Sequence, residues 1–363
     1  MSDGTIAVRE PENRTLQAAR IFAAVFVVFS HCGFPGEFGD IVRVIARFAV
    51  PLFFCISGRY FLPVRDGKAD FTPSVVRRQA LRRLKSLVSI LIPVYLIYTL
   101  YSLFTRMSLG ETISAWAADR FSGGELFTFF VFHSGKVVYD YTYTYDHLWY
   151  LFAELYVYML LFVLAPIVGK TFRLFTVILM LGLYVGILLQ IVYPIRLFDI
   201  SIRTWYVLRN WLLMALPFTG LGIWSRTGLL RKLRLASRRA GIGLIIAGTA
   251  LSLAEWSRIE GREIYLGSLL VVFGILALAE AEEGSAVPGT VEQALVFAGR
   301  ELSGNVYFWH VLLFAVLIRF TFPLEVNVFW LWIRPFVLLS LSLCLAWILW
   351  YTKKRLKPAV QRV

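Results

Sequence analysis

Long apolar segments alternate with short polar connections along almost the whole chain. A helix needs about 20 apolar residues to cross roughly 30 Å of hydrocarbon, and stretches near this length recur from the first segment to the last. They lie at 16–33, 41–62, 86–105, 147–168, 172–193, 209–225, 240–257, 264–281, 304–322 and 329–351. The pattern predicts an all-α, polytopic membrane protein with about ten transmembrane helices.

The charge of the connections predicts the orientation of these helices. Lysine and arginine gather after the second segment, after the sixth segment and in the C-terminal tail. Short basic connections stay on the cytoplasmic side, so both termini are expected in the cytoplasm. Two connections fit less well, because 281–303 begins with acidic residues and Arg196, Arg203 and Arg209 lie in an external connection. Either the helix count is off by one there, or these arginines bind an anionic ligand.

The longest external connection, 106–146, combines an apolar patch too short to span a membrane with a run of tyrosines. We interpret it as a partly buried cap over the external mouth of the bundle. No internal repeat, linker or second soluble domain is evident. Residues 1–363 are therefore expected to form one transmembrane domain with no appended soluble domain.

Composition supports the membrane assignment and removes other classes. The chain is 58% hydrophobic and only 17% charged, with a mean hydropathy of +0.69, which is too apolar for a soluble domain of this length. Its formal net charge of +14 lies largely in the short connections, where it sets membrane topology, so we expect no nucleic-acid partner. The three cysteines lack metal-ligand spacing, so neither a disulfide framework nor a metal site is expected.

Ionisable residues inside the first apolar segment are the first candidate for chemistry. Arg20 and His31 are eleven residues apart, which on a helix places them roughly 16 Å apart along the axis and about 20° apart around it. Ionisable groups within a membrane segment usually face a polar cavity with a function, and histidine accepts protons near neutral pH. The alternative is an interhelical histidine and an arginine that snorkels to the lipid headgroups.

Polar residues of the fourth segment form a second candidate. His147 and Glu154 are seven residues apart and Tyr158 follows on nearly the same helical face. A carboxylate at this depth implies a partner inside the bundle. The stripe could orient the catalytic imidazole or line an acceptor channel, or Glu154 could form a buried ion pair with an arginine such as Arg47.

Three other features admit both a functional and a structural interpretation. Ser57 and Gly58 are small, which allows a helix or a narrow ligand to come close. His310 lies about two turns into the ninth segment, where a lone histidine is commonly structural. The basic segment with Arg82, Arg83 and Lys85 suits either anionic lipid or the phosphates of a cytoplasmic donor such as a coenzyme A thioester.

Taken in order, these motifs resemble integral-membrane acyltransferase family three, whose members acylate hydroxyls of bacterial surface polysaccharides, lipopolysaccharide and peptidoglycan. The resemblance covers nearly the whole chain. It rests on Arg20-x10-His31, PLFFCISG at 51–58, RRLK at 82–85 before Pro93, HLWYLFAELYVY at 147–158 and YFWH at 307–310. It also implies a multi-pass protein of the bacterial inner membrane.

The resemblance implies roles for individual residues. Arg20 and His31 match the family's basic-x10-His pair, with His31 as the catalytic group, and Glu154 matches the glutamate of W-x-L-x-x-E. Ser57 and Gly58 match the family's SG, and His310 the histidine of its penultimate helix. Arg82, Arg83 and Lys85 fall in the basic cytoplasmic motif, although Lys85 stands where arginine is common and the run lies about a turn further from Pro93 than usual.

Together these lines predict an acyl-coenzyme A-dependent O-acyltransferase. The donor's phosphates would bind Arg82, Arg83 and Lys85 with Ser57 beside the pantetheine arm, while Arg47, His147, Tyr158 and His310 would bind the acceptor. His31, oriented by a neighbour such as Glu154, would act as general base for a hydroxyl of an exopolysaccharide or lipid-linked sugar. Cys32 is adjacent to His31 but points about 100° away on the helix, so no covalent intermediate is expected.

Two further questions stay open in the sequence. Six arginines, at 43, 47, 59, 196, 203 and 209, would suit a donor with a carboxylate, such as a succinyl group, whereas acetyl is the commoner donor in the family. The same polar stripes would also suit an exporter of a glycan or lipid-linked sugar, in which they line a permeation path.

Overall fold

The computed structural model describes residues 13–65, 68–139, 146–192, 196–197, 200–201, 205–258, 263–282 and 289–360. These residues are almost entirely helical, as the apolar pattern predicted. The strands form two short hairpins, β1 (Val64–Arg65) with β2 (Lys68–Ala69) and β3 (Arg196–Leu197) with β4 (Ile200–Ser201).

The helices follow one another along the chain with short connections. In the first half they are α1 (Arg14–His31), α2 (Gly36–Ala46), α3 (Ala49–Arg59), α4 (Pro73–Ser108), α5 (Ile113–Arg120), α6 (Gly123–Phe132), η1 (Asp146–Leu148), α7 (Trp149–Val163) and α8 (Ala165–Val192). In the second half they are α9 (Trp205–Leu208), η2 (Trp211–Ala215), α10 (Leu216–Arg226), α11 (Leu229–Lys232), α12 (Arg238–Trp256), α13 (Leu266–Glu280), α14 (Thr290–Phe297), η3 (Ala298–Leu302), α15 (Ser303–Thr321), η4 (Phe322–Leu324) and α16 (Val328–Val360).

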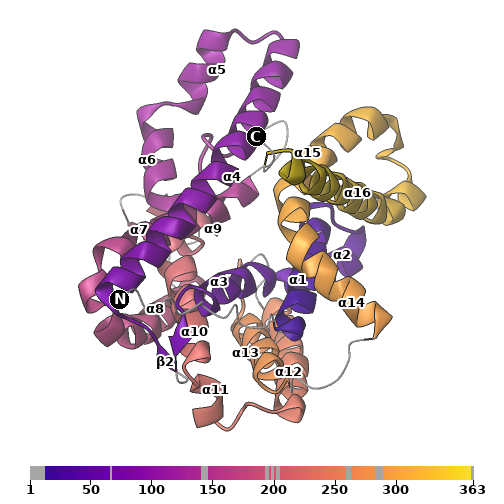
Figure 1. Ribbon diagram of the computed structural model, residues 1–363. Helices are drawn as coiled ribbons and strands as arrows, with labels where there is room; N and C mark the ends of the chain where they lie inside the picture. The colour runs from indigo at the N-terminus through magenta and orange to yellow at the C-terminus, as the bar shows by residue number, and fades with distance from the viewer. Residues whose placement is uncertain are drawn as a thin grey trace.

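Helix α1 lies in the interior of the molecule, beside α2, α3, α13 and α15 (Figure 1). Its start is held by Glu282, which accepts hydrogen bonds from the amides of Arg14 and Thr15 at 3.2 and 3.0 Å. At Gly299 a Cβ would lie 1.8 Å from the carbonyl of Gln17, so η3 and α1 touch backbone to backbone. The N-terminal end of the helix that carries both Arg20 and His31 is therefore held in place.

The predicted helix at 41–62 is two helices, because it breaks at Arg47 and Phe48. Pro51 has no amide hydrogen to donate to the carbonyl of Arg47, four residues earlier, so a continuous helix would lose that bond. The break leaves Arg47 at the end of α2 and Phe48 at the start of α3.

Glycine allows α3 and α10 to cross closely. A Cβ at Gly58 would lie 2.0 Å from the carbonyl of Thr219, and one at Gly222 would lie 2.0 Å from the carbonyl of Cys55. Gly58 thus fits the structural interpretation of the SG motif, in which a small residue lets two membrane helices approach.

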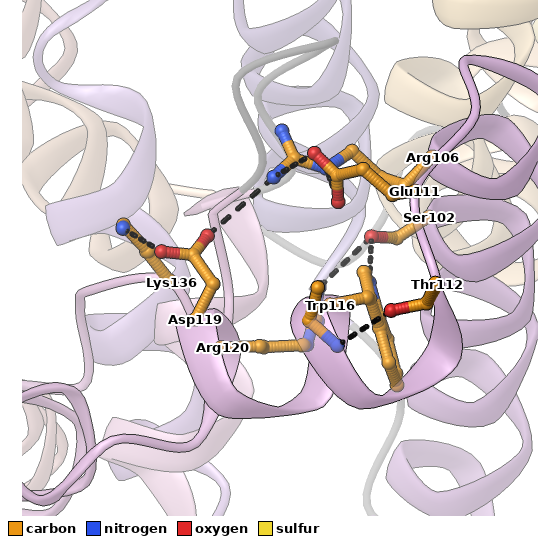
Figure 2. A network of polar contacts seen from close by, with 9 residues as sticks. Ser102, Arg106, Glu111, Thr112, Trp116, Asp119, Arg120 and Lys136 are labelled. Atoms are coloured by element: carbon orange, nitrogen blue, oxygen red, sulfur yellow. Dashed lines mark hydrogen bonds and ion pairs between the residues drawn. The ribbon is translucent and has the colours of Figure 1, made fainter.

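A long arm extends from the end of α4 and is formed by α5 and α6 (Figure 1). Polar contacts hold it together (Figure 2): Arg120 and the Trp116 indole both donate to Ser102 at 3.1 Å, and Asp119 pairs with Arg106 and Lys136. The predicted cap at 106–146 is therefore a braced pair of helices. Its contacts include the Trp211 indole, which donates to the carbonyl of Val131, and residues 140–145 of the tyrosine run lie outside the described residues.

Each of the ten predicted segments lies mainly on helical residues, but the count of ten is not confirmed. Within the described part of the chain, six helical stretches are long and apolar enough to span a membrane: Gly36–Arg59, Pro73–Ser108, Asp146–Val163, Ala165–Leu189, Thr290–Leu324 and Val328–Leu356. Helix α1 is not among them, since Arg14, Gln17 and Arg20 make it more polar. A multi-pass membrane protein is supported, and the cytoplasmic position of both termini stays a prediction.

Candidate active site

Three histidines from distant parts of the sequence meet in the centre of the molecule. His31 ends α1, His147 lies in η1 and His310 lies in α15. The ring centroids of His31 and His310 are 5.0 Å apart, those of His147 and His310 are 5.1 Å apart, and those of His31 and His147 are 5.9 Å apart. His147 and His310 are 2% and 0% exposed, whereas His31 is half-buried. His31 is therefore the most accessible of the three rings.

The accessible side of His31 faces a cavity of about 60 Å³, which we call the His31 cavity. Its charged residues form a chain: Arg47 pairs with Glu263 at 3.0 Å, and Arg209 pairs with Glu263 at 3.5 Å and with Asp146 at 2.6 Å. Two arginines thus face two carboxylates. The sequence did not point to Glu263 or Asp146 as site residues, because each gains its partner only from tertiary contacts.

A second cavity, of about 240 Å³, is lined by Glu154 and by residues from α1, α3, α4 and α15, and we call it the Glu154 cavity. Four predicted site residues line it together with Glu154: Arg20, Ser57, Arg83 and Tyr158. The Tyr158 hydroxyl donates to Oε1 of Glu154 at 2.9 Å. Arg83 lies at the polar side of this cavity and donates to the carbonyl of Tyr60 at 2.7 Å. The predicted residues therefore divide between two cavities.

Two expectations for Glu154 are wrong. It does not orient His31, because it lines the other cavity, and it does not pair with Arg47, whose partner is Glu263. His310 is the better-placed neighbour of His31. Its Nδ1 donates to the carbonyls of Tyr307 and Val306 at 2.8 and 3.1 Å, so Nε2 points away from that backbone. This Nε2 is buried and has no hydrogen-bond partner among the described residues.

Helix α1 connects the two cavities. Arg20 lines the Glu154 cavity and His31 lines the His31 cavity, at the spacing of roughly 16 Å that eleven helical residues impose. Both residues of the pair thus line cavities, as a functional pair would require. In the described residues no group of three His, Cys, Asp or Glu side chains is arranged as metal ligands.

Comparison with known proteins decides the family. The family model Acyl_transf_3, described as an acyltransferase domain, matches residues 13–351. The chain belongs to this acyltransferase family. A search of curated proteins found no match, and a search of solved structures found none either. The resemblance seen in the motifs is thus confirmed, and the protein is a membrane acyltransferase.

In this acyltransferase, the basic segment 82–85 before Pro93 lies about three turns after α4 begins at Pro73. Arg82 and Lys85 are exposed, whereas Arg83 turns inward to the Glu154 cavity. The three cations therefore differ in position: two lie on the surface where a charged group can dock, and one lies where that surface leads into the cavity.

Tyr98 is an additional candidate residue of the acyltransferase that the sequence analysis did not identify. It is fully buried on α4, and its hydroxyl donates to the carbonyl of Phe308 at 2.8 Å and accepts from the amide of Leu312 at 3.0 Å. Those two groups bond directly in a regular helix, so the hydroxyl is inserted into α15 beside His310. It also lies 3.5 Å from Nε2 of His147. No local pattern marks Tyr98, because its partners in α15 are 210 and 214 residues away in the sequence.

Proposed function

We propose that the protein transfers an acyl group from a cytoplasmic acyl-coenzyme A to a hydroxyl of an extracytoplasmic glycan or lipid-linked sugar. The observation that carries this proposal is the pair of polar cavities along α1, one with Arg20 and Arg83 and the other with His31. The phosphates of the donor would dock on Arg82 and Lys85, in the basic N-terminal third of α4, with Arg83 at the cavity entrance. The pantetheine arm would extend through the Glu154 cavity past Ser57.

The reaction needs one base and one attacking oxygen. A ring nitrogen of His31 takes the proton of the acceptor hydroxyl, and the oxygen attacks the thioester carbonyl. The carbon–sulfur bond then breaks, the ester forms, and the coenzyme A thiolate leaves and is protonated. His310 would hold His31 in place through the edge-on packing of their rings, whose centroids are 5.0 Å apart, and His147 lies beside both rings and also lines the His31 cavity. Direct transfer fits Cys32, which is buried in the packing of α1 against α15.

The charge balance favours a neutral acyl group over a succinyl group. Arg47, Arg209 and Arg59 have carboxylate partners, and Arg43 pairs with Asp40. The side chains of Arg196 and Arg203 lie outside the described residues. Paired guanidinium groups have little unbalanced charge left for a donor carboxylate. We therefore propose acetyl, or another small neutral acyl group, as the donor.

The proposal is tested with purified protein in liposomes, labelled acyl-coenzyme A and extracted envelope glycan as acceptor. We expect wild type to label the glycan and to prefer acetyl- over succinyl-coenzyme A. We expect His31→Ala to lose activity by about a hundredfold or more, because a general base typically contributes about 10²–10⁴-fold. Equal or better use of the succinyl donor would contradict the neutral donor. Normal labelling by a correctly inserted His31→Ala protein would contradict the mechanism.

Export of a glycan or lipid-linked sugar is the alternative function. It needs a continuous path wide enough for a sugar, whereas the space around His31 is about 60 Å³, room for about two waters. Export predicts that His31→Ala cells retain unmodified polymer inside, and transfer predicts that they export polymer without its acyl groups. Analysis of exported polymer from wild-type and variant cells separates the two.

A further inference from the structure

Tyr307 lies where the two cavities meet. Of the described residues that line the Glu154 cavity and those that line the His31 cavity, Tyr307 alone lines both. It is 4% exposed and is carried by α15, three residues before His310. A group that moves from one cavity to the other therefore has to pass this ring.

The ring is held in place from both sides. On the side of the Glu154 cavity its centroid is 5.8 Å from that of Phe53 and 5.4 Å from that of Tyr150. On the other side it is 5.6 Å from the ring of His147, and its hydroxyl donates to the carbonyl of His147 at 2.6 Å. Phe53 and Tyr150 line only the Glu154 cavity, so they support the ring without forming the partition.

This position has a chemical consequence if the protein works as proposed above, and the inference rests on that proposal. The thioester arrives through the Glu154 cavity and the acceptor hydroxyl through the His31 cavity. The reacting carbonyl must come within about 3.5 Å of the hydroxyl oxygen, so the acyl group has to lie beside Tyr307 during attack. An open passage there would also admit water to the thioester.

We propose that Tyr307 is the specificity-determining residue for the transferred acyl group and the barrier against water. Its ring limits the acyl chain that can extend beyond the thioester towards His31. It also keeps water in the His31 cavity from replacing the acceptor, a side reaction in which water attacks the thioester and gives the free acid and coenzyme A thiol.

The test compares acetyl- and butyryl-coenzyme A in the liposome assay. We expect Tyr307→Ala to raise the butyryl-to-acetyl ratio of kcat/KM by about tenfold or more, since one or two methylenes change discrimination by this order. We also expect thiol release without acceptor to rise several-fold. Tyr307→Phe keeps the ring and should retain the wild-type ratio. Phe308→Ala enlarges only the Glu154 cavity and serves as the matched control.

An unchanged ratio and unchanged thiol release in Tyr307→Ala would overturn the inference, and so would an equal change in Phe308→Ala. If Tyr307→Ala is not folded, Tyr307→Leu answers the same question with a smaller loss of volume. A second readout, the rate of cysteine labelling, does not depend on acyl transfer. It uses the variant Ser30→Cys, which places a cysteine in the His31 cavity, in a chain whose Cys32, Cys55 and Cys344 are replaced by alanine.

This cysteine should react faster with a small thiol reagent added on the side of Arg83 when Tyr307 is alanine. If labelling is faster in the Tyr307→Ala variant but the wild-type protein transfers no acyl group, Tyr307 is a barrier and the proposed function is wrong. If the wild-type protein transfers acyl groups but the variant shows unchanged labelling and an unchanged donor ratio, the proposed function stands and Tyr307 is not a barrier.

Discussion

His31 differs from the other two histidines of the cluster in what surrounds it. His147 and His310 are almost completely buried, and Nδ1 of His310 is engaged with the backbone of its own helix. His31 alone combines partial exposure with a place in a polar cavity. A base must reach the proton that it removes, so under the proposed function accessibility favours His31 over the two buried rings as the base.

Tyr98→Phe tests whether the supporting residues act through position. Loss of the hydroxyl removes its bonds to Phe308 and Leu312, so we expect kcat to fall roughly tenfold, equivalent to about 1.4 kcal/mol. The donor KM should stay unchanged, because Tyr98 does not line the Glu154 cavity.

Tyr95→Phe is the matched control for this prediction. Tyr95 is on the same helix, and its hydroxyl bonds the carbonyl of Val137 instead of α15, so this variant should keep kcat within about twofold. Steady-state kinetics with acetyl-coenzyme A measure both variants. Equal effects of the two changes would show that Tyr98 has no special relation to the histidines.

At the scale of elements, close helix crossings fix the distances between site residues. Helix α3 brings Ser57 to the Glu154 cavity while its next residue, Gly58, touches α10. The SG motif thus has one residue for the cavity and one for packing, and the functional and structural interpretations of the motif both apply, each to a different residue.

Gly58→Ala should destabilise the fold because its Cβ would lie 2.0 Å from the Thr219 carbonyl and the backbones would have to separate. Overpacking of this kind costs about 1–3 kcal/mol or more. Gly243→Ala is the control, since nothing lies within 4 Å of its Cβ and alanine favours a helix. The thermal midpoint in detergent should fall for the first variant and hold or rise for the second.

The arm contains a group that should respond to pH. His133 ends α6, is 1% exposed and packs on Tyr156 of α7 with ring centroids 4.4 Å apart. Burial lowers the pKa of His133 from 6.5 to about 3. When α6 detaches, the imidazole regains its ordinary pKa, so the detached state binds more protons between these values. The attachment free energy is therefore full above pH 6.5 and falls as the pH drops towards 3.

At pH 5 this single group should cost about 2 kcal/mol of attachment free energy. Hydrogen exchange of the α6 amides measures it, as a protection factor about thirtyfold lower at pH 5 than at pH 8. His133→Asn keeps a side chain that tolerates the left-handed backbone at this position (φ 55°) and cannot titrate. Equal pH dependence in this variant would show that another group is responsible.

At the scale of the whole molecule, the proposed function depends on which side each cavity faces. The basic turns of α4 carry Arg82 and Lys85 on the surface near the Glu154 cavity, and the arm begins at the opposite end of the same helix (Figure 1). Positively charged segments stay in the cytoplasm, so α4 should cross the membrane from its basic end to the arm.

Labelling of single cysteines tests this orientation. With Cys344 replaced by alanine, we expect Gly124→Cys in the arm to react with an impermeant maleimide added to intact spheroplasts. Lys85→Cys should react only after the membrane is opened. Both positions are exposed, so access to the reagent depends on the side of the membrane. The reverse labelling pattern would show that the protein has the opposite orientation, with the basic residues of α4 on the external side.

The sequence by itself determined the class of structure and most members of the site. The thickness of the bilayer sets the length that each apolar segment needs in order to cross it. Each helix could therefore be predicted from its own segment of sequence. The ordered motifs identified the acyltransferase family and named His31, Arg20, Ser57, Arg83, His147, Tyr158 and His310, all of which lie in or beside the two cavities. That Arg20 and His31 lie on the same face of one helix followed from helix geometry alone.

Tertiary structure alone decided which residues share a cavity. Glu154 was expected beside His31 and lies in the other cavity, while Glu263 and Asp146 pair with Arg47 and Arg209, a pairing that the sequence did not predict. Tyr98 carries no local signal, because its contacts with His147 and α15 come from elements far apart in the chain. Tyr307 belongs to the YFWH motif, but that motif does not show that its ring meets His147. Side-chain neighbours across a bundle follow from how whole helices pack, and no spacing within one segment contains that information.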